Sequence, residues 1–251
     1  MKTIKIASHI HSAFSDDSTA ALPGLVRTLR RAGYHGALVC DHDRTMTELS
    51  WHRLQDECAR ISQATNFILV PGIEYQDADH VVHMPVYGPV PFFGRSPNLD
   101  ELLPAVVASG GVAVFAHPAR RDAWKRFDKA WVPYLGGLEV WSRKYDGIRP
   151  NEWALEMSAL LGVTPYVSLD YHGPRQLFPL AMKVRVSQHA EPEDVLRALR
   201  TGSTRPSAFG MHPERFSSGA LGAFSSGMEA TRRWGAPQLR RLESARGSRH
   251  Q

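Results

Sequence analysis

Nine side chains of metal-binding type are spread along this chain, and each lies at or near an end of a stretch that the sequence predicts to be a β-strand. They are His9, His11, Asp16, His42, Glu74, His83, His117, Asp170 and His172. Imidazole and carboxylate groups together suit divalent ions such as Mn²⁺, Zn²⁺ or Fe²⁺. In parallel β/α barrels the active site is built from several strands at their carboxyl ends. The pattern therefore predicts a centre that holds more than one metal ion.

The segment SHIHSAFSDD carries the first candidate ligands. His9 and His11 are two residues apart on an extended run, so both imidazoles are expected to point to the same side. Asp16 and Asp17 follow in a loop, where Ser-Asp pairs are also common turn residues. This segment alone is weak evidence for a metal, because histidines at this spacing occur by chance.

The second cluster, VCDHD, directly follows a β-rich stretch. His42 is expected to face the site. Asp41 and Asp43 face the other way on an extended chain, so we expect them to brace loops or ligand histidines. Cys40 shares the face of His42, and we interpret it as a buried thiol rather than a ligand.

Three later clusters complete the set, and the first of them combines the neighbouring runs VPGIE and HVVH. Glu74 ends the run VPGIE, and the two histidines of HVVH are three apart, so only one of them, taken as His83, faces inward. His117 ends the apolar run VAVFAH, and Asp170 and His172 share a face in VSLDYH. Singly, each residue has an ordinary explanation as a polar cap on a loop. Five clusters of ligand chemistry, all at strand ends, favour one shared site.

The elements that must position these residues alternate between short apolar runs and amphipathic helical segments. Strands are predicted at residues 4–7, 36–41, 66–71, 81–87, 112–116, 137–141 and 164–169. Helices are predicted at residues 22–32, 48–64, 99–109, 152–161 and 191–200, with Gly33, Gly110 and Gly162 just past three helix ends. This alternation predicts a parallel sheet, and ligands from nearly every strand favour its closure into a barrel.

Length and composition fit one barrel domain of an intracellular protein. The chain has 251 residues, 43% hydrophobic and 22% charged, which is enough for a full core. The first residues show no apolar secretion signal, no stretch is long enough to span a membrane, and two cysteines are too few for a disulfide scaffold. We therefore expect a cytoplasmic protein without a membrane partner.

The net charge of +5 is unevenly distributed. Residues 212–251 hold seven Arg and three Glu, so this segment carries +4 and residues 1–211 are nearly neutral. We predict a barrel at residues 1–211 and an Arg/Ser/Gly-rich, mobile tail at residues 212–251 that is dispensable for chemistry. The basic tail is also a candidate contact for nucleic acid.

The motifs together resemble the PHP (polymerase and histidinol phosphatase) family over about residues 3–175. The family's HxHSxxSD corresponds to His9–Asp16, its DH pair to Asp41–His42, its PGxE to Pro71–Glu74, its HxxH with a YG ending to His80–Gly88, its AHP to Ala116–Pro118 and its DxH to Asp170–His172. All nine ligand positions are filled. Asp17 stands where relatives usually carry Gly, a change expected to be harmless.

The resemblance implies a distorted seven-stranded (β/α)7 barrel of TIM-like type that holds up to three divalent ions. By that analogy His9, His11, Glu74 and Asp170 hold the first ion. Glu74 bridges to a second ion, held also by His83 and His117. Asp16, His42 and His172 hold the third.

The resemblance also implies a hydrolase acting on phosphoric esters. The charge of three divalent ions exceeds that of three carboxylates and a bridging hydroxide by two, which suits a phosphate monoester dianion. We expect a small metabolite or nucleotide to be hydrolysed by a metal-bridging hydroxide, with Glu74, His117 and Asp170 as catalytic residues. Arg120 and Arg143 are the predicted substrate phosphate ligands, and Lys144 is a weaker candidate.

Two other functions stay open. A nuclease or phosphodiesterase acting on nucleic-acid ends would use the same centre, with the basic tail as an accessory contact. An amidohydrolase is third, because that superfamily also uses HxH in a β/α barrel. It usually needs a metal-bridging lysine at a strand end, and only the Lys144 region offers one.

Overall fold

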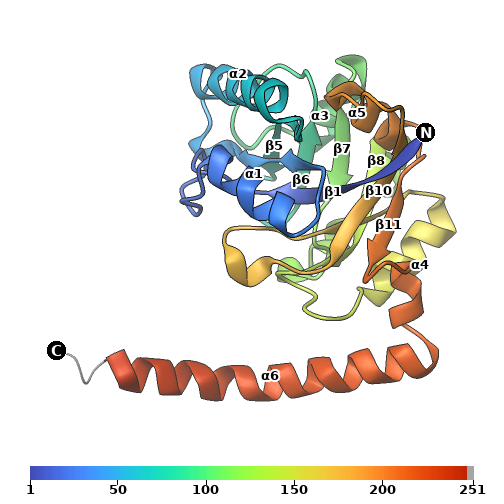
Figure 1. The fold of residues 1–251 in the computed structure, drawn as a ribbon. Helices are drawn as coiled ribbons and strands as arrows, with labels where there is room; N and C mark the ends of the chain where they lie inside the picture. The colour runs from blue at the N-terminus through green and yellow to red at the C-terminus, as the bar shows by residue number, and fades with distance from the viewer. Residues whose placement is uncertain (248–251) are drawn as a thin grey trace.

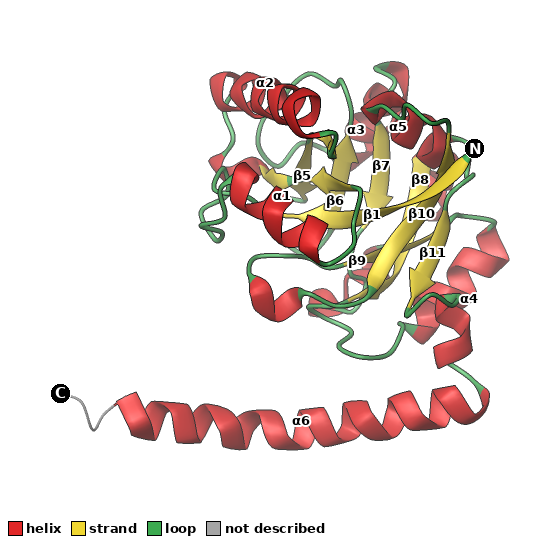
Figure 2. Cartoon of the chain, in the orientation of Figure 1, coloured by secondary structure: helices red, strands yellow, loops and turns green. Residues whose placement is uncertain are grey.

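The computed structural model of the chain describes residues 1–247, which form a mixed α/β fold (Figures 1 and 2). The strands are β1 Lys2–Ile10, β2 Gly36–Val39, β3 Asp41–His42, β4 Ile68–Val70, β5 Gly72–Gln76, β6 His83–Tyr87, β7 Val112–Phe115, β8 Leu135–Ser142, β9 Pro165–Ser168, β10 Leu180–Val186 and β11 Arg205–Ala208. The helices are α1 Leu22–Arg31, α2 Glu48–Thr65, α3 Leu99–Ala108, α4 Glu152–Leu161, α5 Pro192–Arg200 and α6 Gly219–Gly247.

The helices of the body begin and end where local sequence signals place them. In α1 the apolar residues Leu22, Leu25, Val26 and Leu29 share one face, and all four are buried. Helix α2 begins with a capping box between Thr47 and Ser50. The three glycines predicted to follow helix ends all have positive φ angles, between 68° and 84°. Those angles strain residues that carry a side chain, so glycine ends the helices there.

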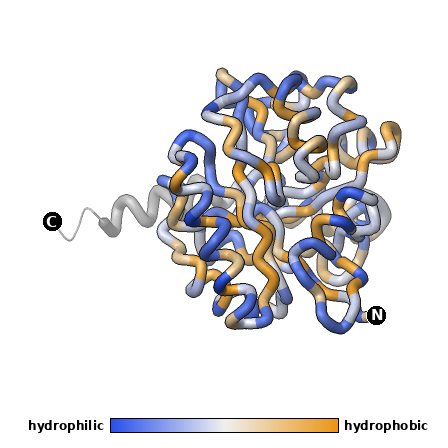
Figure 3. The backbone as a smooth tube through the Cα atoms, turned by 90° about the horizontal axis from the view of Figure 1, so that it is seen from above, coloured by the Kyte–Doolittle hydropathy of each residue, from blue (hydrophilic) through white to orange (hydrophobic). Residues whose placement is uncertain are grey.

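The strands form two hydrogen-bonded sheets within residues 1–247. The first has the order β11-β10-β1-β2-β4, and the second has the order β3-β5-β6-β7-β8-β9. Buried apolar side chains from both sheets form one continuous core, and Figure 3 shows hydrophobic segments recurring throughout the body. The α/β class predicted from the sequence is confirmed.

Backbone pairing links the two sheets at two places. Cys40 separates β2 from β3 and Pro71 separates β4 from β5, so the same two chain segments pair first in one sheet and then in the other. Beyond β9, the amide of Tyr171 donates to the carbonyl of His9 at 2.9 Å, and the amide of His11 donates to the carbonyl of Tyr171 at 2.9 Å. Closure into one seven-stranded barrel stays a prediction, because the strands described are assigned to two sheets and not to a single ring.

The expectation of a purely parallel sheet is wrong for β6 and for the added strand β10. Strand β6 pairs antiparallel with both β5 and β7, and β10 pairs antiparallel with β1. Only residues 77–82 connect β5 to β6, which is too short for a crossover helix and permits only a hairpin. His83 therefore begins β6 instead of ending it. Because the strand is reversed, that beginning lies at the edge where the parallel strands end.

The C-terminal segment contains more regular structure than its composition suggested. A short 3-10 turn, Pro213–Phe216, packs the Phe216 ring 5.3 Å from the Trp141 ring of β8, measured between centroids. Helix α6 follows and runs along the lower side of the body in Figure 1. The domain boundary at residue 212 stays a prediction. Within the part of the chain that is described, no helix combines the length and hydropathy needed to cross a membrane.

Candidate metal centre

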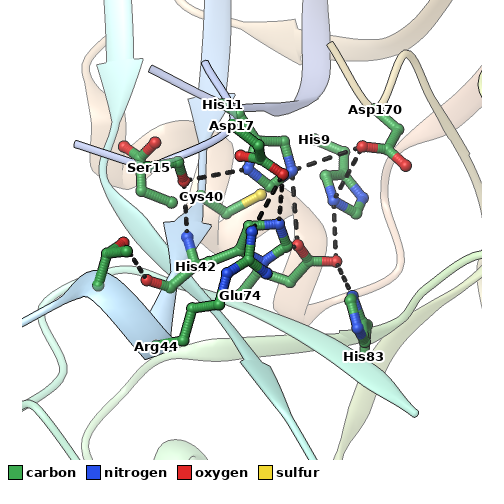
Figure 4. Close-up of polar contacts among 12 residues, drawn as sticks. His9, His11, Ser15, Asp17, Cys40, His42, Arg44, Glu74, His83 and Asp170 are labelled. Atoms are coloured by element: carbon green, nitrogen blue, oxygen red, sulfur yellow. Dashed lines mark hydrogen bonds and ion pairs between the residues drawn. The ribbon is translucent and has the colours of Figure 1, made fainter. Parts of the chain in front are cut away.

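Glu74 of β5 lies at the centre of the clustered side chains, buried with only 1% of its surface exposed (Figure 4). Five imidazoles surround its carboxylate, each through one nitrogen: His83 Nδ1 at 2.8 Å, His9 Nε2 at 3.1 Å and His117 Nε2 at 3.1 Å from Oε1, and His42 Nδ1 at 2.9 Å and His11 Nε2 at 3.4 Å from Oε2. A single carboxylate thus contacts histidines from β1, β3, β6 and the segment after β7.

Asp170, which follows β9, faces Glu74 across the same space. Its Oδ1 lies 3.5 Å from His11 Nε2 and 3.3 Å from His172 Nδ1, and its Oδ2 lies 4.0 Å from His117 Nε2. Eight of the nine predicted ligands thus come together in one cluster that spans residues 9–172. The prediction that His9 and His11 point to the same side is confirmed, with ring centroids 5.1 Å apart.

Three of these residues have left-handed backbone conformations. The φ angles are 60° at His9, 26° at His117 and 46° at Asp170. A positive φ costs a residue with a side chain about 1–3 kcal/mol, and such residues concentrate at functional sites. At His9 the conformation coincides with a shift in the β1–β2 register between Ala7 and Ile10. The backbone is distorted at the positions where the side chains must converge.

The buried polar atoms of the cluster fit a set of cations. Within the described residues, seven of them have no hydrogen-bond partner: His9 Nε2, His11 Nε2, His42 Nδ1, Glu74 Oε2, His83 Nε2, His117 Nδ1 and Asp170 Oδ2. Unpartnered buried polar atoms are costly and rare in proteins. Two triads share Glu74, namely His9–Glu74–His117 and His42–Glu74–His83, and the ligand atoms of each lie within 4.8 Å of one another. The donors suit divalent ions, and Glu74 is placed to serve two of them.

A third group contains Asp17 where the sequence predicted Asp16. Asp17 Oδ2 lies 3.1 Å from His42 Nε2 and 3.0 Å from His172 Nε2, and His11 completes the group. The Asp16 carboxylate instead accepts from the Arg44 guanidinium, with an NH2–Oδ1 distance of 2.7 Å, and its side chain is 52% exposed. The structure thus places Asp16 outside each potential metal group.

Glu139 was missed at the sequence level. It is fully buried on β8, with Oε1 2.8 Å from His9 Nδ1 and Oε2 accepting the His117 amide at 2.8 Å. A carboxylate beside Nδ1 favours the His9 tautomer with its proton on that nitrogen, which would leave the Nε2 lone pair for a metal. The sequence signal that could have identified Glu139 is its place as the single acid inside the apolar run GGLEVWS. An unpaired charge is costly at such a position, so a buried partner is expected there.

Three neighbours of His42 have the supporting roles expected of them. Asp41 accepts from the amide and the hydroxyl of Ser12, at 2.7 and 2.6 Å. Asp43 accepts from the Ser96 amide at 2.7 Å. Cys40 is buried with its sulfur 3.4 Å from the Tyr87 hydroxyl, and burial raises the pKa of its thiol. The two aspartates brace loops, and the thiol is protonated at neutral pH, although its sulfur also lies close to the His9 and His11 nitrogens.

Four groups of the cluster have lowered pKa values, the two imidazoles because of burial and the two carboxyls because of neighbouring imidazoles. Burial lowers the pKa of His11 to about 3 and that of His83 to about 4, so both rings are neutral ligands at pH 7. Burial opposes ionisation of Glu74, but the surrounding imidazoles outweigh it and hold the pKa of that carboxyl well below its ordinary value. Burial also opposes ionisation of Asp170, and His9 is the main group that holds the pKa of this carboxyl well below its ordinary value. Both carboxylates are therefore available as anions.

The predicted phosphate ligands lie in different surroundings. Arg120 donates to the carbonyls of His80 and Val81, at 2.6 and 3.3 Å, on the rim beside His83. The Arg143 guanidinium lies 4.8 Å from the centre of the Phe178 ring, on the side of β8 that faces α6. The structure therefore does not bring Arg143 to the cluster.

Lys144 and Tyr145 reach the cluster instead. Lys144 Nζ lies 3.5 Å from Asp170 Oδ1 and 3.1 Å from His172 Nε2, and 31% of its side chain is exposed. The Tyr145 ring lies 4.6 Å from the His117 ring, measured between centroids. Of the three cations considered from the sequence, Lys144 is the one in contact with candidate metal ligands.

Comparison with known proteins identifies the fold. No family model and no curated protein sequence matches the chain. Among solved structures, a two-domain protein from Bacteroides vulgatus that contains a predicted PHP-like metal-dependent phosphoesterase matches with a TM-score of 0.62 and 16% identity. The match covers 82% of this chain and 65% of that protein. The chain shares its fold with proteins named PHP-like metal-dependent phosphoesterases.

Two further solved structures share the fold. A protein from Bifidobacterium adolescentis, described as a candidate metal-dependent phosphoesterase, matches with a TM-score of 0.55 and 20% identity over 78% of this chain and 96% of that one. An amidohydrolase from Chromobacterium violaceum with bound sulfate matches with a TM-score of 0.54 and 15% identity, over 78% of this chain and 96% of that one. The resemblance predicted from the motifs agrees with the PHP-like neighbour from Bacteroides vulgatus, and the three matches cover 78–82% of this chain.

Proposed function

We propose that this chain is a metal-dependent phosphoesterase that hydrolyses phosphate monoesters of small metabolites or nucleotides. The observation that carries the proposal is Glu74, whose two oxygens are shared among five imidazoles in a fully buried site. The PHP-like neighbours support a metal-dependent phosphoesterase, and the residues of this chain supply the donors that such an enzyme requires.

The proposed ions would be held in three positions. His9, Glu74 and His117 form the first, and His42, Glu74 and His83 form the second. A third would use His11, Asp17 and His172. His42 borders both the second and the third position and would bind only one of these ions, because a neutral imidazole has a single free nitrogen lone pair. Bound divalent ions supply positive charge for the phosphoryl oxygens and lower the pKa of water at the site.

The protein groups around this space would orient the reaction. The Asp170 carboxylate has a free Oδ2 and is ionised, so it can accept a hydrogen bond from the attacking water and orient it. The Lys144 ammonium, on the open side, can bind a phosphoryl oxygen as a point charge. Glu139 holds His9 and the His117 backbone in place throughout.

The surroundings of the site favour an anionic substrate. Lys144 and Arg44 lie on its exposed side, and Arg120 lies beside His83. Arg44 is paired with Asp16 and Asp17, and Arg120 donates to backbone carbonyls, whereas Lys144 directly contacts the candidate metal ligands Asp170 and His172. Lys144 is therefore our first candidate for the substrate phosphate, in place of Arg143.

Turnover of p-nitrophenyl phosphate by the Mn²⁺-loaded protein, alongside a panel of sugar phosphates and nucleoside monophosphates, tests this function. We expect hydrolysis of monoesters that is lost on chelation and restored by metal. Preferential hydrolysis of bis-p-nitrophenyl phosphate or short oligonucleotides would replace the monoesterase with a phosphodiesterase or nuclease. Absence of turnover on all phosphoesters by protein with full metal content would reject the proposal.

An amidohydrolase is the second candidate, because one structural neighbour is named so and a lysine does follow β8. In this chain, however, Lys144 contacts one side of the cluster, and it is Glu74 that lies between the two metal-binding triads. A series of N-acetyl amino acids in the same panel distinguishes the two functions. Turnover of an amide but of no phosphoester would favour the amidohydrolase.

A further inference from the structure

A short loop after β8, residues 142–148, lies between the metal cluster and the C-terminal segment. One side of the loop carries Lys144 and Tyr145, which contact the cluster at Asp170, His172 and His117. The other side, at residues 147–148, meets α6. A contact that fixes residues 147–148 therefore helps to fix Lys144 and Tyr145, together with Asp146, which accepts from the Ser142 amide within the loop.

Glu229 of α6 is the residue that meets this second side. Its side chain is only 4% exposed, and its Oε2 accepts the amide of Ile148 at 3.2 Å. Gly147 adopts a φ of +74°, and a Cβ there would lie 2.4 Å from Glu229 Oε2. The carboxylate thus lies so close to the loop backbone that any side chain at position 147 would clash with it.

Two arginines on the same helix keep Glu229 ionised and oriented. Arg232 donates to both carboxylate oxygens, at 2.6 and 2.8 Å, and Arg233 donates to Oε1 at 2.8 Å. With the Ile148 amide, the carboxylate receives four hydrogen bonds. In three of them the donor is a guanidinium, so both partners are charged, and such bonds are shorter and stronger than neutral ones. This is an unusual concentration of bonds for a segment whose composition suggested a mobile tail.

The loop and the C-terminal segment also both contact the indole ring of Trp141. Trp141 of β8 donates its Nε1–H to the carbonyl of Gly147 at 3.2 Å, and Phe216 packs against the same indole. The hydroxyl of Ser225, on α6, donates to the carbonyl of Phe216 at 2.8 Å. The first turns of α6 are thus joined to β8 through Phe216 and to the loop through Glu229.

We propose that Glu229 is a positioning residue, and that the segment from Pro213 to Arg233 fixes the loop that presents Lys144 and Tyr145 to the substrate. The proposal rests on the proposed function insofar as the ligand is a phosphate. It replaces the expectation that residues from 212 onward are dispensable. Loss of the Glu229 contact frees the loop backbone without removing any metal ligand, so the cost falls on substrate binding.

The test compares Glu229→Ala and Glu229→Gln with Glu214→Gln, whose carboxylate is 75% exposed in the same segment. For Glu229→Ala we expect KM for p-nitrophenyl phosphate to rise about tenfold, the scale of one lost hydrogen bond, with kcat within about threefold. Glutamine can still accept from Ile148, so Glu229→Gln should recover most of the affinity. Metal content should stay at the wild-type level, and Glu214→Gln should behave as wild type.

A double mutant separates positioning from general destabilisation. If Glu229 acts through Lys144, the Lys144→Met variant should have a raised KM and a kcat near that of the wild type. Adding Glu229→Ala to Lys144→Met should then cause little further change in KM. Fully additive effects would overturn the proposal, as would an unchanged KM in folded Glu229→Ala protein. Circular dichroism confirms folding, and Glu229→Gln carries the same comparison if the alanine variant does not fold.

Two measurements decide the proposal without turnover, so that its failure is distinct from failure of the proposed function. Hydrogen exchange across residues 143–148 should be faster in Glu229→Ala and unchanged in Glu214→Gln. Calorimetry on Mn²⁺-loaded protein should show that Glu229→Ala and Lys144→Met each weaken binding of inorganic phosphate. Wild-type exchange rates or unchanged phosphate affinity in Glu229→Ala would reject the positioning role even if the enzyme is active.

Discussion

The Asp17 carboxylate lies 3.1 Å from His42 Nε2, in the position expected for its neighbour Asp16. Asp16 is turned outward to Arg44, and Arg44 also reaches Asp17 Oδ2 at 3.2 Å. His42 responds to this arrangement. Burial opposes its charged form, but the Glu74 and Asp17 carboxylates outweigh burial and raise the pKa of His42 to about 9. Because Asp17 contacts His42 and Asp16 does not, Asp17 is the aspartate that helps to raise the pKa of His42.

The first prediction is that Asp17→Asn removes about one equivalent of metal, whereas Asp16→Asn leaves the metal content unchanged. Asparagine is a poorer ligand because it lacks the charge that a divalent cation attracts. Elemental analysis of both variants after growth with added Mn²⁺ measures this. Both variants replace a carboxylate by an amide, at adjacent positions of the chain, so each is the control for the other. Loss of metal in Asp16→Asn alone would return the ligand role to Asp16.

The second prediction concerns the centre itself. Glu74→Gln, His117→Ala and Asp170→Asn should each lower kcat/KM by about a thousandfold or more, the scale of losing about 4 kcal/mol of transition-state stabilisation. Glu74 contacts five imidazoles, so loss of its charge disturbs two metal groups at once. His35→Ala and His189→Ala are the controls, since both side chains are exposed and outside the cluster. If Glu74→Gln kept over a tenth of the activity with full metal content, Glu74 could not have the proposed bridging role.

The third prediction is that Glu139→Gln weakens metal binding about tenfold to a hundredfold, as removal of a partner behind a ligand histidine usually does. Glutamine has one acceptor oxygen, so it cannot serve both His9 Nδ1 and the His117 amide. Competition with a chromogenic chelator gives the affinities. Glu156→Gln, at an exposed position of α4, is the matched control. Equal affinities in the two variants would show that Glu139 does not orient the ligands.

The fourth prediction is a pH dependence of stability that comes from Asp146. Burial raises the pKa of this carboxyl to about 7, even though it accepts the Ser142 amide at 2.7 Å. The unfolded chain, with a pKa of about 4, releases the proton first, so the folded state binds more protons between the two values. The contribution of Asp146 is therefore fully present below about pH 4, falls by about 1.4 kcal/mol per pH unit above it, and levels off above pH 7.

Urea unfolding of the wild type and Asp146→Asn, both with chelator, measures this contribution. The free energy of unfolding of the wild type minus that of the variant should decrease from pH 4.5 to pH 7 and then stay constant, because asparagine does not titrate. Other ionisable groups are common to both proteins and cancel in the difference. A difference that is flat from pH 4.5 to pH 7 would show that Asp146 has an ordinary pKa in the folded protein.

Local sequence determined much of this protein. The periodicity of α1, the capping box of α2 and the glycines after three helices are local signals, and the structure follows them closely. Eight of the nine predicted ligands converge for a similar reason. Strands alternate with connections in the chain, and polar residues directly after apolar runs end up at one edge of the sheets.

Three other features of the site were decided by the tertiary structure alone, because they depend on contacts between residues that are far apart in the sequence. Asp17 replaces Asp16 in the cluster through a turn that Arg44 holds from outside. Glu139 has a role only because β8 lies where both His9 and His117 can reach it. Charge and composition suggested a free tail, yet one buried carboxylate on α6 meets a loop about 80 residues earlier in the chain. Spacing can predict which face a side chain occupies, but only the packed fold determines what lies opposite that face.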